Sequence, residues 1–387
     1  MTFEEKIFGA AYKKQERSRV VNESGATVGG GSHSSERRPE QERIEQQLCA
    51  GFDTLLEQLR RDPEALHERI ERLRALPDCE GILGKLDPYF RTEHWEIAAT
   101  LEAYDKRTFD HSLRVAAFVY DMASGAGETA AYMKSRVEIE QSSLEELFTA
   151  ALFHDIGKTA IPNEILHDNH SRREWGKRAN DWARKNGRDR HFDPEKLETL
   201  DEVELDHYFM QVHALNTTDP LNIVPLEEIF SPEILRELER HGISPHDTFR
   251  KVLECHEKAT GAILRHHKMY VASDIASHHH DYEHRPIRLQ RYQTETSVVR
   301  LGFELSILRS MDVYDALTSD DRSYKDSYHP LLALEILIKE AEIEFTEPEL
   351  TKYVIRDLYK KLESSQRNIP GSNDESRALQ KILTFIG

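Results

Sequence analysis

The chain has 387 residues, and its 52 basic and 70 acidic residues give a formal net charge of −18. This acidity argues against a general nucleic-acid-binding surface, which would be basic. It still permits a small phosphate substrate, because metal ions and a few basic side chains can reverse the field in a cleft. The length allows a sizeable core and more than one domain.

Three widely spaced cysteines, Cys49, Cys79 and Cys255, form neither CxxC spacing nor a disulfide framework. A reducing compartment is the simpler interpretation. The sequence has no apolar run of about 18 residues and no signal-peptide core, so we expect no membrane span. These observations together predict a cytoplasmic protein.

The N-terminal part divides into a tail and a pair of helices. Residues 1–42 include a Gly/Ser-rich stretch and are predicted to be a disordered, flexible tail. Residues 43–100 are predicted to form N-terminal helices. Apolar residues recur every three or four positions from Leu48 to Leu59, and a second helix follows Pro63. We expect these helices to pack against the region that follows.

Residues 101–387 are predicted to form a catalytic domain that is almost wholly helical. Strand-like alternation is scarce, and Leu305, Leu308 and Met311 recur on one helical face, with Asp312 on the same side. Two amphipathic helices, at 331–342 and 347–362, are expected to close the bundle. The fold class is therefore predicted to be all-α, a helical bundle with added N-terminal helices and a long insertion.

The insertion, at about 167–250, is predicted to be mostly helical, with helices within 167–193, 195–215 and 231–241. Loops this long inside a compact domain are uncommon and usually functional or disordered. Three roles remain open: a lid over the active site, a contact in a homodimer, and an external embellishment. Trp175 and Trp182 can stack on a base, but packing is the favoured interpretation.

Histidines and carboxylates gather at positions that indicate a metal site. His154 and Asp155 stand side by side in an otherwise apolar stretch that is predicted to be helical, and a buried aspartate needs a partner such as a metal ion. His111 lies upstream, and His256, the run His278–His280 and Asp312 lie downstream. These ligand types suit divalent Mn, Fe, Ni or Zn.

The motifs around these residues resemble those of the HD superfamily of metal-dependent phosphohydrolases. Within it they are most similar to the HD-GYP group, which hydrolyses cyclic dinucleotides. The resemblance covers roughly residues 105–330. Its most specific parts are His154-Asp155-Ile-Gly-Lys158 with Ile161-Pro162, and Asp312-Val-Tyr-Asp315-Ala-Leu-Thr-Ser319.

The sequence also departs from the family pattern. The Gly-Tyr-Pro signature is absent, because Asp281-Tyr-Glu-His-Arg-Pro286 follows His280. His256 stands five residues before Gly261, where the family has four. Arg107 occupies the position of a third-metal glutamate found in some members. We therefore expect two divalent metal ions rather than three.

The resemblance implies a role for each candidate residue. Asp155 would bridge the two metals and carry catalysis, with His111, His154 and Asp312 on one ion and His256, His279 and His280 on the other. His278 is the spare histidine. Lys158 would hold a substrate phosphate, as would Arg322 and Lys325, although Arg322 stands one residue later than the family pattern places it.

The implied function is a phosphodiesterase that hydrolyses a cyclic dinucleotide (cyclic di-GMP-like) through a hydroxide shared by the metals. The expected partner is thus a small phosphorylated nucleotide. Three alternatives remain: an HD nucleotidase acting on mononucleotides, a di-iron HD oxygenase, and an HD-GYP-like signalling module that binds a nucleotide without turnover. Phosphate-contacting basic residues disfavour the oxygenase, and the intact ligand set disfavours the module.

Overall fold

The computed structural model describes residues 39–76, 78–136, 141–166, 171–189, 192–200, 205, 208, 224–240, 243–280, 292–293, 298–299, 302–319, 327–342 and 344–387. It divides into two compact units. One comprises residues 1–44 and 162–254, and the other comprises residues 45–161 and 255–387. The predicted insertion falls within the first unit, whereas the second holds all seven predicted metal ligands.

The N-terminal helices are α2 (Pro39–Arg60), α3 (Pro63–Arg74), α4 (Asp78–Leu86), the short 3₁₀ helix η1 (Asp87–Tyr89) and α5 (Thr92–Tyr104). α2 begins at Pro39, inside the range predicted as tail, and residues 1–38 lie outside the described part. The chain turns between α2 and α3 because Asp62 caps α3, accepting the N–H of Ala65 at 3.0 Å, and Pro63 cannot donate to a preceding helix.

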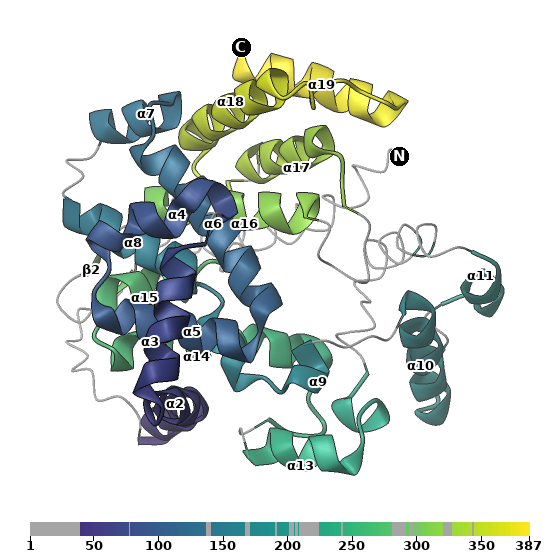
Figure 1. Ribbon diagram of the computed structural model, residues 1–387. Helices are drawn as coiled ribbons and strands as arrows, with labels where there is room; N and C mark the ends of the chain where they lie inside the picture. Colours follow the sequence, from purple (N-terminus) through teal and green to yellow (C-terminus); the bar gives the residue numbers. More distant parts are fainter. Residues whose placement is uncertain are drawn as a thin grey trace, which may run out of the picture. The chain divides into compact units, whose positions relative to one another are not determined.

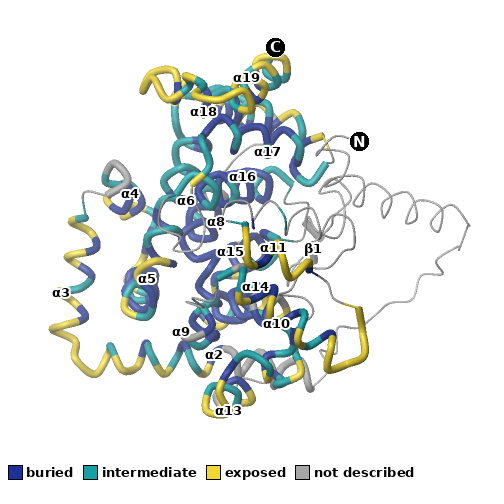
Figure 2. Tube along the Cα trace, turned by 90° about the vertical axis from the view of Figure 1, so that its right-hand side faces the viewer, coloured by how far each residue is buried: buried dark blue, intermediate teal, exposed yellow. Residues whose placement is uncertain are grey.

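The centre of the second unit is a bundle of α6 (Lys106–Ser124), α8 (Gln141–Phe153), the part of α14 (Phe249–His266) from residue 255, α15 (Tyr270–Ala276) and α16 (Gly302–Thr318). α7 (Glu128–Arg136) joins α6 to α8 along the chain. α6 packs against α8 and α16, and α15 packs against α8. Figure 2 shows α8 and α16 as largely buried, and their apolar residues belong to one continuous core.

The C-terminal helices are α17 (Pro330–Glu342), α18 (Pro348–Ser364) and α19 (Asn373–Ile386), which lie together at the yellow end of the chain in Figure 1. The first two match the predicted helices at 331–342 and 347–362. α19 was not predicted. It packs on α17 and α18, and it buries Ala378 and Ile382.

The insertion unit contains α9 (Asn163–Leu166), α10 (Arg172–Lys185), α11 (Pro194–Thr199), η4 (Leu226–Glu228) and α13 (Pro232–Arg240). The helices predicted within 167–193 and 231–241 are confirmed as α10 and α13. In the range 195–215 the described residues include only the short α11 and single positions.

Contacts inside the insertion unit use its aromatic and basic side chains. Trp175 is buried against the ring of Phe249 (5.4 Å between centroids), which confirms the packing interpretation for this residue. Arg173 donates to the carbonyls of Leu197 and Leu200, and Arg178 donates to that of Glu228. These arginines thus stabilise the unit itself. The lid, dimer and embellishment roles stay predictions.

The described strands are β1 (Tyr292–Gln293) and β2 (Val298–Val299), a short antiparallel pair in which Tyr292 lies opposite Val299. The all-α fold class is therefore confirmed. Among the described helices, none combines the length and the apolar character needed to cross a membrane.

Candidate metal centre

The fold brings the seven predicted metal ligands together. His111 comes from α6, His154 and Asp155 from the turn after α8, His256 from α14, and Asp312 from α16; His279 and His280 follow α15. Three groups have ligand atoms that all lie within 4.8 Å of one another: His256, His279 and His280; His111, His154 and Asp155; and His154, His279 and Asp312.

Asp155 lies between the two histidine groups and presents a different oxygen to each. Its Oδ1 is 3.3 Å from Nε2 of His256. Its Oδ2 is 3.7 Å from Nε2 of His111 and 3.6 Å from Nε2 of His154. This division of its oxygens suits a carboxylate that bridges two cations with one oxygen on each.

Two buried histidines are oriented as metal ligands usually are. Nδ1 of His154 donates to the carbonyl of Ala151 at 2.9 Å, and Nδ1 of His279 donates to that of Ala276 at 2.5 Å. Each bond leaves Nε2 as the acceptor nitrogen. Both Nε2 atoms are buried and have no hydrogen-bond partner among the described residues. A buried polar atom without a partner is energetically costly, and a bound cation that accepts the Nε2 lone pair would remove this cost. The two histidines therefore fit a metal site.

His279 and His280 can act together because they lie beyond the end of a helix. α15 ends at Ala276, and the following turn carries both residues. Their rings are 4.0 Å apart between centroids, and each ring centroid is 5.4 Å from that of His256. In a continuous helix adjacent side chains diverge by about 100°, so the helix end makes the shared direction possible.

Asp315 is a part of the centre that sequence reasoning did not assign. Its Oδ2 accepts from Nδ1 of His111 at 2.7 Å, while Nε2 of His111 lies 3.0 Å from Oδ1 of Asp312. Arg114 donates to Asp315 and to the hydroxyl of Ser319. Asp315 therefore orients His111 toward Asp312 and Asp155. Its spacing of three residues from Asp312 on α16 was the available signal.

Burial and neighbouring charges shift the pKa values of several residues in the site. Burial disfavours the carboxylate of Asp155, but Lys158 and the surrounding histidines outweigh it and hold its pKa well below the usual range. Burial also opposes protonation of His111, yet hydrogen bonds with Asp312 and Asp315 raise its pKa to about 9. Burial, with Asp312 acting in the opposite sense, lowers the pKa of His280 to about 3. The centre therefore combines ionised carboxylates with neutral imidazoles on the His280 side, which is the ligand form that divalent ions require.

Among the predicted phosphate contacts, only Lys158 lies in the described part. Its ammonium is 2.5 Å from Oδ2 of Asp155, and its side chain is 26% exposed. The exposure lets the ammonium reach solvent as well as Asp155. Arg322 and Lys325 lie outside the described residues.

The backbone of the turn after Asp155 lies very close to the backbone of α14. The 3₁₀ helix η2 (Ile156–Ala160) follows Asp155, and a Cβ built on Gly157 would lie 1.9 Å from the carbonyl oxygen of His256. Only glycine fits there. Thr260 occupies the position four residues after His256, where the family pattern has glycine, and its hydroxyl joins Gly157 to His154.

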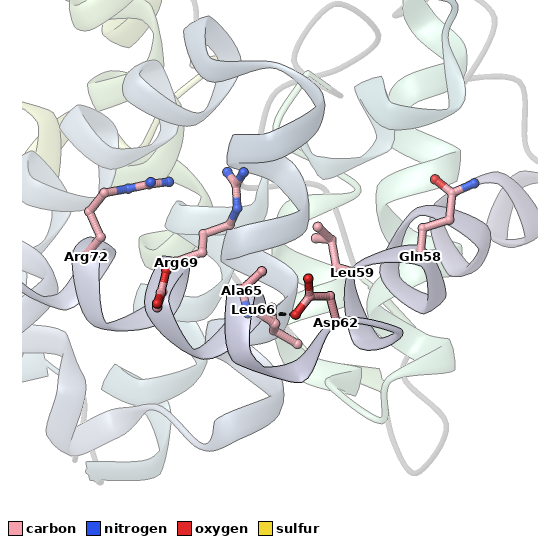
Figure 3. A pocket seen from close by; sticks show the side chains of 8 residues that line it. Gln58, Leu59, Asp62, Ala65, Leu66, Arg69 and Arg72 are labelled. Carbon is pink, nitrogen blue, oxygen red and sulfur yellow. Dashed lines mark hydrogen bonds between the residues drawn. The ribbon is translucent and has the colours of Figure 1, made fainter.

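A separate hollow of about 280 Å³ lies along α2 and α3 (Figure 3). Its basic side chains Arg69 and Arg72 both pair with Glu102 of α5. None of the predicted metal ligands lines it.

Comparison with known families agrees with this geometry. The HD domain family model matches residues 108–224, a range that includes His111, His154 and Asp155 and ends before His256. The match supports assignment to the HD superfamily, whose members are metal-dependent phosphohydrolases. No curated protein and no solved structure matches the chain.

Proposed function

We propose that this protein is a phosphodiesterase that uses two divalent metal ions to hydrolyse a cyclic dinucleotide. The observation that carries the proposal is the position of Asp155, whose two oxygens face two different groups of histidines. Two-metal centres of this kind suit hydrolysis of phosphate esters. Bound divalent ions lower the pKa of water and neutralise charge on phosphoryl oxygens.

The protein's own residues supply the ligand field and a cation for substrate. Hydrogen bonds to backbone carbonyls orient His154 and His279, and Asp315 orients His111. Lys158 adds a positive charge that is partly exposed beside Asp155. In an otherwise acidic chain, this ammonium would attract a substrate phosphate to the centre.

The proposal is tested with protein loaded with Mn²⁺ or Fe²⁺ and assayed by product analysis. The substrates are cyclic dinucleotides, the linear dinucleotides and mononucleotides, with Asp155→Asn as the inactive control. We expect two metals per chain and hydrolysis of the cyclic substrates, both lost in the variant. Turnover of mononucleotides alone would replace the proposal with a nucleotidase. Tight nucleotide binding without any product would indicate a binding module.

The same assay under anaerobic conditions separates hydrolysis from the oxygenase alternative. Hydrolysis consumes water and no oxygen, so the rate should be unchanged when oxygen is removed. An activity that appears only in air, with the iron-loaded protein, would overturn the hydrolase assignment.

A further inference from the structure

Arg309 is a buried cation next to the metal centre that none of the roles above explains. It lies on α16, three residues before Asp312, and is only 2% exposed. A guanidinium out of water is costly unless its donors are matched by acceptors. Its position therefore indicates that its contacts are specific.

Its contacts join three parts of the fold. Nε of Arg309 donates to the carbonyl of His279 at 3.2 Å, and Nη1 donates to the carbonyl of Phe345, in the corner between α17 and α18. Arg309 thus connects α16, which carries Asp312, to the turn that carries His279 and His280. The positive charge of Arg309 also acts on the buried carboxyl of Glu340 on α17, where it favours the ionised form and opposes the effect of burial on the pKa.

The hydrogen bond from Arg309 to the carbonyl of His279 affects two predicted metal ligands at once. The carbonyl belongs to the peptide group that links His279 to His280, so its direction sets the backbone of both residues. The two residues follow the end of α15 and lie in the turn formed by residues 277–280. Within the described contacts, Nδ1 of His279 bonds to Ala276, and Arg309 holds the peptide group on the other side.

We propose that Arg309 is a positioning residue for one half of the metal centre: it orients the His279–His280 peptide so that both imidazoles face His256. The inference rests on the proposed two-metal function and adds that the two ions depend on different supports. The group of His256, His279 and His280 depends on Arg309. The group of His111, His154 and Asp155 does not.

The choice of arginine has a physical reason. Its planar guanidinium presents donors in fixed directions, so one side chain can hold two carbonyls from different segments. A lysine keeps the charge but concentrates its donors at one atom at the end of a flexible chain. Lysine at this position should therefore restore the interaction only in part.

The experiment compares Arg309→Met and Arg309→Lys with a matched control, Arg356→Met. Arg356 also donates to a backbone carbonyl, that of Ile386, but it pairs with Glu128 and touches no predicted metal ligand. Mn²⁺ titration gives the number of ions and the Kd of each. Amide hydrogen exchange of the proteolytic peptide that contains residues 277–280 measures how firmly this part of the backbone is held, and it can be recorded with or without metal.

In Arg309→Met we expect one Mn²⁺ to bind about 10–100-fold more weakly, the range typical for loss of a residue that supports metal ligands, while the other ion is unaffected. Exchange at 277–280 should be faster than in Arg356→Met, with Arg309→Lys intermediate. If Arg309→Met fails to fold, the comparison of Arg309→Lys with the unsubstituted protein decides the question by the same two measurements.

Two further outcomes separate this inference from the proposed function. Unchanged exchange at 277–280, or equal weakening of both ions, would overturn the role of Arg309 while leaving a two-metal enzyme intact. An unsubstituted protein that binds none of Mn²⁺, Fe²⁺, Ni²⁺ and Zn²⁺ would overturn the proposed function and the metal-positioning role together.

Discussion

The hydroxyl of Thr260 on α14 accepts the N–H of Gly157 in η2 at 2.9 Å and donates to the carbonyl of His154 at 2.9 Å. Thr260 is fully buried, and its two partners, Gly157 and His154, are buried as well. One hydroxyl therefore fixes the turn that carries His154 and Asp155 to the helix that carries His256. The bond joins the segments that carry Asp155 and His256, which the sequence assigns to the metal centre.

Replacing Thr260 with valine should weaken both the fold and the metal site. The change keeps the volume but leaves the N–H of Gly157 without its partner, at a cost of about 1–3 kcal/mol for a buried donor. Thr260→Ser, which keeps the hydroxyl, is the control. Urea unfolding of the metal-free proteins measures the loss, and equal stability of the valine and serine variants would contradict the prediction.

Gly157→Ala should be more damaging than its chemistry suggests. The added Cβ would lie 1.9 Å from the carbonyl oxygen of His256 and 2.5 Å from the nitrogen of Thr260, so a backbone must move. Overpacking of this kind costs about 1–3 kcal/mol. In Gly84→Ala the Cβ meets nothing within 4 Å, and the helix gains about 0.5–1 kcal/mol. Thermal unfolding should therefore show opposite signs for the two alanine variants.

Lys158→Met should keep the metal ions and lose affinity for substrate. Removing the ammonium takes away a charged hydrogen bond to phosphate, a loss on the order of 1.5–3 kcal/mol in kcat/KM. Metal content measured by elemental analysis is the control, because Lys158 also pairs with Asp155. Full activity of this variant on a phosphodiester would rule out the phosphate role.

Metal uptake should release protons at neutral pH. With a pKa of about 9, His111 holds a proton at pH 7 in the metal-free protein, and a metal can bind only after that proton leaves. Apparent affinity should therefore rise with pH up to about 9. Calorimetry in buffers of different ionisation enthalpy counts the protons. Asp315→Asn removes one of the carboxylates that stabilise the protonated form of His111. The variant should therefore release fewer protons when it binds metal.

His94 should make stability depend on pH in the acid range. Burial lowers the pKa of His94 from 6.5 to about 4. Between these two pH values the unfolded chain therefore binds a proton that the folded protein does not bind. The contribution of His94 to stability is then lost as the pH falls from about 6.5 toward 4, by up to about 3 kcal/mol, and this contribution is constant above that window. His94→Gln should flatten this part of the profile in urea titrations, and an unchanged slope would argue against it.

Part of the fold follows from local pattern. Apolar spacing predicted α16, α17, α18 and the N-terminal helices, because an amphipathic helix must show its buried face in the sequence. The pattern missed α19 and placed His154 and Asp155 in a helix, whereas they lie in the turn after α8. Helix ends depend on contacts such as the one between Gly157 and α14, which spacing does not reveal.

The sequence by itself determined the donor types of the candidate centre, since the imidazoles and carboxylates are given directly by the residue types. The tertiary structure decided which atoms face one another. Asp315 reaches His111 across 204 positions, and Arg309 reaches His279 across 30. The contacts are directional hydrogen bonds that form only when helices distant in sequence pack together. Their partners are therefore set by the packing of the core rather than by any local pattern.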